Sequence, residues 1–317
     1  MGQGPRLRAV FICSAQYSGS TLLNLLLGTH PDAAALGEIT HLPKNLALDT
    51  PCSCGESARR CPVWRQVLAR VRCFPQWREI DEDPYVLHLG MIRAGKVIDP
   101  RHQTRARLLY RKILYGAAFA HFRWGLGPLA PFVAPLYRGS RNKLALFRIV
   151  SEVLGADVLV DSSKHYLEAV SLYKTAPSDV RVILLTRDGR AVYSSALKRG
   201  SSKKSAALEW RRTYARAIPL LRKHVHPDHL IQVRYEDLVL APERELARLC
   251  GFLGLEYTAE MLDFRSKRHH VLNGNDMRLS PVAEIRPDFA WRERLSPRDL
   301  GYFDTHAGAL NRMLGYA

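Results

Sequence analysis

Residues 14–21 have the side chains and the spacing of a loop that binds a phosphate group. The separation between Ser14 and the run Gly19, Ser20, Thr21 equals that of the P-loop pattern G-x-x-x-x-G-K-[ST], but Ser14 replaces the first glycine and Ser20 replaces the lysine. Backbone N–H groups near Gly19 and at the start of a following helix would point toward one anion, and the hydroxyl groups would donate further hydrogen bonds. A polar turn that only caps a helix has the same composition. The segment therefore predicts either an anion site without the ATPase lysine or a simple helix cap.

Two further groups of polar residues follow apolar runs that are typical of buried strands. Lys164 comes shortly after the run 158–160, and Arg187 directly follows the run 180–186. In a parallel sheet, Lys164 would emerge beside the phosphate loop. Ser195 lies eight residues after Arg187 in a predicted helix, and the two side chains could hold a second phosphate group between them.

Glu38 is a candidate acid–base residue. Residues 33–36 predict a short buried strand, and Glu38 follows it at the carboxyl edge of the predicted sheet, where open α/β folds bind ligands. A carboxylate at this edge could accept a proton from a substrate. It could equally cap the next segment or pair with a surface arginine.

Strands and helices in regular alternation must position these groups. Residues 9–13 predict a strand before the loop, and the leucine-rich residues 22–27 predict a helix after it. Similar units begin with the predicted strands at 158–160, 180–186 and 230–234. This alternation predicts an α/β fold with a P-loop-like central parallel β-sheet flanked by helices. We expect a single domain over residues 1–317, in which residues 75–150 form a helical insertion.

The chain is strongly basic. Its 317 residues include 47 Lys and Arg against 30 Asp and Glu, which gives a formal net charge of +17. Residues 100–151 contain ten Lys or Arg and no acid, and Arg123 and three prolines interrupt their apolar runs, so no transmembrane span is expected there. This segment is either a solvated helical subdomain or a lid or membrane-surface patch. Because residue 10 onward already predicts a strand instead of a signal peptide, we expect a cytoplasmic protein.

Four of the six cysteines are clustered. Clustered thiols at short spacing favour zinc, but a disulfide or reduced buried thiols compete with that interpretation. The late residues His269 and His270 lie in a predicted surface turn, where no third metal ligand is evident. The clustered cysteines are Cys52, Cys54, Cys61 and Cys73.

Several of these pieces occur together, in this order, in the PAPS-dependent sulfotransferases, and the chain resembles that family. Residues 17–23 resemble the loop that binds the 5′-phosphosulfate of PAPS (3′-phosphoadenosine 5′-phosphosulfate). Residues 185–195 resemble the family's 3′-phosphate motif. Residues 30–38 are similar to the segment that carries the catalytic base in tyrosylprotein and bacterial members. Further segments that recur in bacterial members are 161–164, 234–238 and 274–278.

The resemblance implies in-line transfer of the sulfuryl group of PAPS to a hydroxyl or amine of an acceptor, with PAP as the product and no catalytic metal. It implies that Glu38 is the general base and that Lys164 and Ser20 stabilise the leaving phosphate. The cofactor-binding residues that it implies are Gln16, Tyr17, Ser18, Gly19, Ser20, Thr21, Leu22, Arg187, Ser195, Asn275 and Arg278.

Tyr17 departs from the family pattern. Most members carry Lys or Arg at this position, where the cation neutralises charge on the leaving phosphate. Lys164 could supply that cation from the neighbouring strand.

The insertion, residues 75–150, is expected to contact the acceptor, which would be a small molecule, lipid or glycan of acidic or lipophilic character. Peripheral contact with a membrane is compatible with the same segment, and nucleic acid is not an expected partner. Two other functions remain open: a P-loop kinase-like phosphotransferase, which the serine at position 20 disfavours, and a non-catalytic basic protein that binds nucleic acid or a membrane surface.

Overall fold

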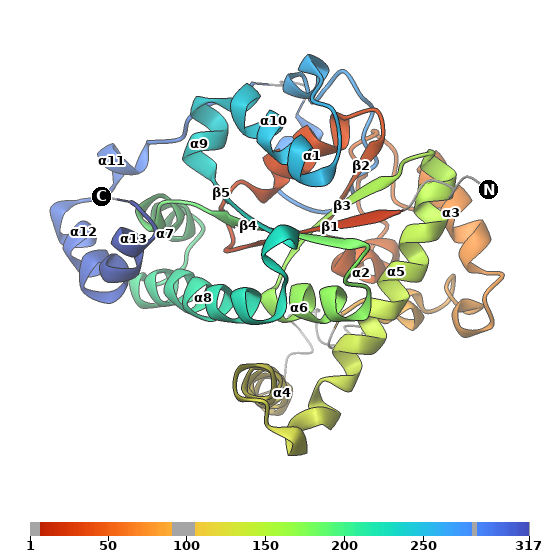
Figure 1. Cartoon of the computed structure of the whole chain (residues 1–317), viewed down its shortest axis with the longest axis horizontal. Helices are drawn as coiled ribbons and strands as arrows, with labels where there is room; N and C mark the ends of the chain where they lie inside the picture. Colours follow the sequence, from red (N-terminus) through yellow and green to blue (C-terminus); the bar gives the residue numbers. More distant parts are fainter. Residues whose placement is uncertain (1–6, 91–104, 281–283, 317) are drawn as a thin grey trace.

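The computed structural model describes residues 7–90, 105–280 and 284–316, and these residues surround a central five-stranded sheet (Figure 1). All neighbouring strands are parallel. The strands are β1 (Arg8–Ser14), β2 (Ala33–Gly37), β3 (Val158–Lys164), β4 (Val180–Thr186) and β5 (Leu230–Arg234). The predicted α/β class with a parallel sheet is therefore confirmed, and each predicted strand is present.

Strand order explains where a ligand can bind. The order is β2-β3-β1-β4-β5, so the chain moves to one side of β1 through β2 and β3 and to the other side through β4 and β5. The connections that leave the carboxyl ends of the strands diverge at such a reversal, and a crevice forms there. The loop after β1 lies at this point.

Both faces of the sheet are buried, which is why its strands are almost continuously apolar. Within β1, Val10 and Ile12 belong to one hydrophobic cluster, whereas Phe11 and Cys13 belong to another. This alternation follows the two-residue period of a strand. Each cluster is the core between the sheet and one layer of helices.

Helices cover the two faces as separate layers (Figure 1). One layer contains α1 (Ser20–Thr29), α9 (Tyr235–Leu240) and α10 (Pro242–Leu253). The opposite layer contains α6 (Tyr166–Thr175), α7 (Gly189–Lys198) and α8 (Lys203–His224).

Two long helices make up most of the predicted insertion. They are α4 (Arg105–Trp124) and α5 (Ala134–Leu154), and the 3₁₀ segment Gly127–Phe132 separates them. Two of the predicted helix-breaking prolines lie in that segment and the third lies in the first turn of α5. Helix α5 packs on α6 and α3 (Pro62–Val71), whereas α4 contacts α8.

The amino-terminal part of the insertion includes the short helix η3 (Pro84–Leu87), while α2 (Leu42–Ala47) precedes the insertion. Residues 100–104 of the basic segment lie outside the described residues. Among the helices that the structure describes, none has the length and apolar character needed to cross a membrane.

The C-terminal helices hold the start of α7. They are α11 (Trp291–Arg294), α12 (Pro297–Phe303) and α13 (Ala309–Met313). The Oδ1 atom of Asn311 accepts a hydrogen bond of 2.7 Å from the Gly189 N–H. A Cβ atom at Gly189 would lie 2.4 Å from Cζ of Phe303, so only glycine fits at the start of this helix. The C-terminal segment thereby positions the residues that follow β4.

Candidate active site

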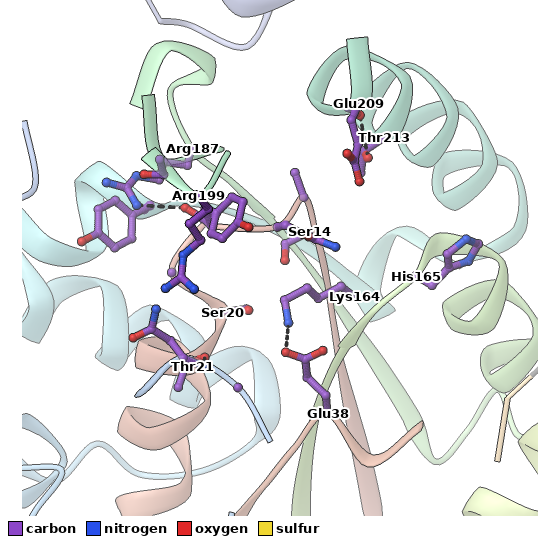
Figure 2. A pocket seen from close by; sticks show the side chains of 18 of the residues that line it. Ser14, Ser20, Thr21, Glu38, Lys164, His165, Arg187, Arg199, Glu209 and Thr213 are labelled. Carbon is purple, nitrogen blue, oxygen red and sulfur yellow. Dashed lines mark hydrogen bonds and ion pairs between the residues drawn. The ribbon is translucent and has the colours of Figure 1, made fainter. Parts of the chain in front are cut away.

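A large cleft opens at the carboxyl ends of the strands (Figure 2). Its volume is about 1430 Å³, and its walls come from the loop after β1, the ends of β2, β3 and β4, and helices α4, α7 and α8. Among its lining residues, cations outnumber acids by ten to five. The cations are Arg111, Lys164, Arg187, Lys198, Arg199, Lys204, Arg212, Arg216, Arg286 and Arg294, and the acids are Glu38, Glu168, Glu209, Glu284 and Asp288. The cleft therefore has the electrostatic character of an anion site.

The loop after β1 has the backbone geometry of an anion-binding loop. Tyr17 and Gly19 both have left-handed backbone angles, with φ values of 61° and 85°. A Cβ atom at Gly19 would lie 2.3 Å from the Tyr235 ring, so a larger residue cannot replace this glycine without displacing that ring. Helix α1 starts immediately afterwards at Ser20, and the N–H groups of its first turn have no partners within the helix. The predicted strand–loop–helix unit is thus present, with Gln16, Tyr17, Gly19, Ser20, Thr21 and Leu22 lining the cleft.

Ser18 does not line the cleft, in contrast to the prediction. Its hydroxyl is buried and forms a hydrogen bond of 3.1 Å with the hydroxyl of Tyr214 on α8. That tyrosine also donates to the carbonyl of Leu185 at 2.9 Å. Ser18 therefore anchors the loop to the opposite helix layer.

Two polar atoms in the cleft wall are buried and have no partner among the described residues. They are Oγ of Ser14 and Nε of Arg187. Buried polar groups in proteins normally form hydrogen bonds, so unpaired donors at a cleft fit a bound ligand that has acceptor oxygens. The donor set therefore fits an anionic cofactor.

Arg187 and Ser195, the predicted residues of a second phosphate site, both line the cleft. Arg187 donates to the carbonyl of Tyr17 and to the carboxylate of Asp288, each at 2.9 Å, and its guanidinium stacks 4.2 Å from the centre of the Tyr235 ring. Partial burial raises the pKa of Asp288, but the hydrogen bond and the charge of Arg187 outweigh this effect and lower it below its usual value. The Ser195 hydroxyl donates to the Ala191 carbonyl at 2.9 Å, which leaves its oxygen free to accept.

Asn275 lines the cleft, whereas Arg278 does not. The backbone N–H of Asn275 donates to Oγ1 of Thr21 at 3.0 Å, which joins this late loop to the phosphate loop. The guanidinium of Arg278 is buried and donates to the carbonyls of Pro51 and Val271 at 2.9 and 3.3 Å. These carbonyls hold the side chain outside the cleft lining, and the cofactor contact of Arg278 stays a prediction.

Glu38 and Lys164 meet at the ends of adjacent strands. Nζ of Lys164 donates a hydrogen bond to Oε1 of Glu38, and Nε2 of His41 lies 3.7 Å from Oε2 (Figure 2). Glu38 precedes the 3₁₀ turn Ile39–His41, but its side chain forms no capping hydrogen bond there. Among the described residues, Glu38 therefore pairs with a lysine instead of an arginine and does not cap the turn that follows it. Figure 2 shows the pair facing Ser20 and Thr21 across the cleft.

A buried ionic cluster lies next to the segments that carry Glu38 and Lys164. Nζ of Lys143 on α5 lies 3.1 Å from Asp161 and 3.0 Å from Glu168. Thr40 also donates to Glu168, at 2.7 Å, and Ser163 N–H donates to Asp161 at 2.8 Å. Burial alone would lower the pKa of Lys143, but the two carboxylates outweigh it and raise the pKa. The cluster connects the insertion to the turns that carry Glu38 and Lys164.

Sequence reasoning missed Lys143, although a signal for it exists. It lies on the same helical face as Leu136, Ser140 and Phe147, all of which are buried. A lysine on a core-facing stripe is rarely buried without an ionic partner. Such a position predicts a buried ion pair.

Sequence reasoning also missed Arg199 at the basic rim of the cleft. Arg199 follows Ser195 by one helical turn, and its guanidinium lies 5.5 Å from the centre of the Tyr17 ring. Arg111 and Tyr115 reach the cleft from α4, and Arg212 and Arg216 reach it from α8. For Arg199 the signal in the sequence is a cation one helical turn after Ser195 of the predicted phosphate motif.

His165 completes the cleft wall on the side of α4. Its ring lies 4.8 Å from the rings of both Tyr115 and Tyr166, and its Nδ1 accepts a hydrogen bond of 3.3 Å from the N–H of Leu167. Burial lowers the pKa of His165 to about 4. The imidazole is therefore neutral at physiological pH.

The cysteines group differently from the prediction. Cys73 is exposed, and its thiol contacts the carbonyl of Ala69 at 3.6 Å, so it does not belong to the cluster. The other three members lie together with His270, which was expected to be part of a surface turn. All six cysteines fall in the described part of the chain and are free thiols there.

Comparison with known proteins agrees with this architecture. The chain matches the family described as "Sulfotransferase family" over residues 9–259. A curated relative from Caenorhabditis briggsae, provisionally named a protein-tyrosine sulfotransferase, is 32% identical over 108 residues, which cover 32% of this chain. That match spans 36% of the length of the relative.

A solved structure shows the same fold. The sulfotransferase domain from the curacin biosynthetic pathway is similar with a TM-score of 0.52 and 18% identity, covering 98% of this chain and 99% of that domain. The sulfotransferase domain of the Synechococcus PCC 7002 olefin synthase is similar with a TM-score of 0.47 and 21% identity, and the match covers 96% of this chain and 95% of that domain. Because the family match covers most of the chain, including the phosphate loop, Glu38, Lys164, Arg187 and Ser195, this protein belongs to the sulfotransferase family of enzymes.

Proposed function

We propose that the protein transfers the sulfuryl group of PAPS to a hydroxyl or amine of an acceptor. The observation that carries this proposal is the meeting, in one cleft, of a phosphate loop without the ATPase lysine, a second basic anion site and a carboxylate–lysine pair. When bound, PAPS supplies the activated sulfuryl group. The cleft residues bind and orient PAPS, and one of them takes the proton of the acceptor.

The two anion sites would hold the donor at both ends. The N–H groups at the start of α1, with the hydroxyls of Ser20 and Thr21, provide donors for the 5′-phosphosulfate. Arg187 and Ser195 would provide the site for the 3′-phosphate, where the Ser195 hydroxyl would turn its proton from the Ala191 carbonyl toward a phosphate oxygen. Contacts at this remote group orient the reacting end for in-line transfer, because binding energy away from the reaction centre restricts its motion.

Glu38 would act as the general base. Its carboxylate lines the cleft and would take the proton that the acceptor loses as it attacks sulfur. The hydrogen bond from Lys164 fixes the position of this carboxylate, and the buried cluster of Lys143, Asp161 and Glu168 supports the segments on which both residues lie.

Positive charge near the leaving phosphate would come from two side chains. Lys164 contacts Glu38 and faces Ser20 and Thr21 across the cleft (Figure 2). Arg199 lies over the ring of Tyr17, the position at which most family members carry a cation. We therefore propose that Arg199 and Lys164 together supply the positive charge that a Lys or Arg at position 17 supplies in most family members.

Helices α4 and α8 would form the acceptor side. Arg111 and Tyr115 from α4 face the same cleft as Arg212 and Arg216 from α8. This wall combines aromatic surface with positive charge, so it suits acceptors that carry an anionic group beside an apolar or aromatic body. A tyrosyl side chain in an acidic peptide is one such acceptor, and the name of the Caenorhabditis briggsae relative points to it.

Binding measurements with PAP test the function. A calorimetric titration at two salt concentrations should give one PAP per chain, with affinity that depends modestly on salt, while ATP binds more weakly because Ser20 replaces the P-loop lysine. A matching rise in the unfolding midpoint with PAP is expected, because only the native state has both anion sites. Stabilisation by ATP but not PAP would support the kinase-like alternative. Binding only to RNA or anionic vesicles, abolished by salt, would support the non-catalytic alternative.

A further inference from the structure

Three cysteines and one histidine converge at a place that the proposed transfer reaction does not use. Cys52, Cys54 and Cys61 are buried, and their sulfur atoms lie with a ring nitrogen of His270 in a group whose members are all within 4.8 Å of one another. None of the four residues lines the cleft. We propose that these residues bind one Zn²⁺ ion as a closed structural site.

Two distances between the proposed ligand atoms are close to those of a tetrahedral zinc site. Two thiolates that each lie about 2.3 Å from a tetrahedral zinc ion are about 3.8 Å apart. The sulfur atoms of Cys52 and Cys61 are 3.7 Å apart. Cys61 Sγ and His270 Nδ1 are 3.2 Å apart, a few tenths of an ångström closer than the same geometry requires. A shift of the half-buried His270 ring would open this distance.

The set of donors also selects the metal. Three thiolates and one neutral imidazole form the Cys₃His set of structural zinc sites, and soft sulfur ligands disfavour Mg²⁺ and Ca²⁺. Each thiol would lose its proton to solvent as the metal binds. The site would then carry a net charge of about −1, from three thiolates and one divalent ion.

Two arginines lie where they can offset that charge. Arg268 donates to the carbonyl of Cys54 at 2.7 Å, and Arg278 donates to the carbonyl of Pro51 at 2.9 Å. Both therefore contact the short segment that carries two of the proposed ligands. This gives the buried Arg278 a role at the metal site.

Hydrogen bonds already join the two segments that carry the proposed ligands. Ser53, between two of the cysteines, donates from Oγ to the carbonyl of His269 at 2.8 Å and accepts from the N–H of Val271 at 2.9 Å. The indole N–H of Trp64 donates to the carbonyl of His270 at 2.8 Å. Ligands that are fixed by such contacts need little rearrangement to bind a metal.

The site would tie two distant parts of the chain together. Residues 52–61 precede the insertion, whereas His270 begins the segment that places Asn275 against Thr21 of the phosphate loop. Zinc would therefore stabilise the late loop on one side of the cleft. This structural role does not depend on the proposed transfer reaction.

Metal analysis of the full-length protein tests the proposal. Protein purified without chelators should contain close to one zinc per chain by inductively coupled plasma mass spectrometry. After zinc removal under reducing conditions, cobalt should give the visible absorption of a tetrahedral thiolate site. Protein that contains no zinc and takes up neither metal after reduction would overturn the proposal, as would an intact mass that shows a disulfide within this group.

Variants then assign the ligands. Cys61→Ser and His270→Ala should lose zinc, whereas Cys73→Ser, at the exposed cysteine outside the group, should retain it. Chelation should lower the unfolding midpoint of the parent and of Cys73→Ser but not that of Cys61→Ser. Equal zinc content in all of these variants would contradict the assignment. If Cys61→Ser does not fold, the zinc content and cobalt spectrum of the parent still decide, and neither measurement requires PAPS or an acceptor.

Discussion

Nζ of Lys164 donates a hydrogen bond to Oε1 of Glu38 and so joins the carboxyl ends of the neighbouring strands β3 and β2. In the proposed reaction, Glu38 takes the proton of the acceptor, and Lys164 stabilises the leaving phosphate on the other side of the sulfuryl group. Their direct contact means that a change in one also alters the position of the other. Single and double substitutions are therefore needed to separate their roles.

Glu38→Gln should reduce kcat by roughly 10² to 10⁴, because the amide keeps the size of the side chain but cannot accept the acceptor proton. PAP affinity should change less than turnover, since the glutamine can still accept the hydrogen bond from Lys164 and Glu38 has no contact with the phosphate loop or with Arg187 among the described interactions. Sulfuryl transfer from labelled PAPS and calorimetry with PAP would measure the two quantities. Glu152→Gln, at an exposed residue, is the control. Parental turnover in Glu38→Gln would remove this residue as the base.

Tyr17→Lys should restore activity to Arg199→Ala if Arg199 replaces the cation that most family members carry at position 17. We expect Arg199→Ala alone to reduce kcat/KM about five- to tenfold, which corresponds to roughly 1 kcal/mol for an exposed charge. Lys164→Ala should cost more, roughly 10², because it removes a donor inside the cleft and releases Glu38.

Steady-state kinetics of the single and double variants would distinguish these assignments, with Arg222→Ala on the exposed side of α8 as the control. If Tyr17→Lys restores the activity of Lys164→Ala but not that of Arg199→Ala, then Lys164, and not Arg199, replaces the cation that is missing at position 17.

Arg111→Ala should raise the KM for an anionic acceptor while the dissociation constant for PAP stays unchanged. Arg111 reaches the cleft from α4 and has no contact with the phosphate loop among the described interactions. A change of several-fold is expected, because the side chain is exposed and its charge is screened by solvent. Lys112→Ala, at the exposed neighbour that does not line the cleft, is the matched control. Weaker PAP binding with unchanged acceptor kinetics would contradict an acceptor role for α4.

Lys143→Met should destabilise the protein by about 3–5 kcal/mol, because it leaves two buried carboxylates without their cation. Lys143 is only 2% exposed and pairs with both Asp161 and Glu168. The free energy of unfolding from urea titration would measure the loss. Adding Asp161→Asn and Glu168→Gln to the same chain should recover part of it. If the single variant is as stable as the parent, the ion cluster does not support the fold.

His165 should make the protein less stable in mild acid. Burial lowers the pKa of His165 from 6.5 to about 4 in the folded state, so between these values the unfolded chain binds more protons. Stability is therefore present above the unfolded pKa and falls as the pH drops from about 6.5 toward about 4.

The variant His165→Asn retains an acceptor for the Leu167 N–H but does not titrate, so its unfolding midpoint should fall less over this pH range. Identical pH profiles for parent and variant would show that the titration of His165 does not cause the loss of stability in acid. The comparison depends on the difference between the profiles, because other buried groups also titrate.

The sequence by itself determined the strands and the local motifs. Apolar runs bounded by polar residues identified every strand, because burial on both faces requires continuous apolar residues. The spacing from Ser14 to Thr21 and from Arg187 to Ser195 predicted two candidate anion sites, whose residues mostly line one cleft. Glu38 could be predicted because its position at a strand end follows from local order alone.

Only the tertiary structure decided which distant residues meet. Lys143 reaches Asp161 through the packing of α5 on the sheet, Arg199 reaches Tyr17 because α7 crosses beside the phosphate loop, and His270 joins cysteines more than two hundred positions earlier. Ser18 and Arg278 match family motifs, yet long-range hydrogen bonds turn both side chains away from the cleft. Side-chain direction depends on partners that lie far away along the chain, and neither local periodicity nor spacing contains that information.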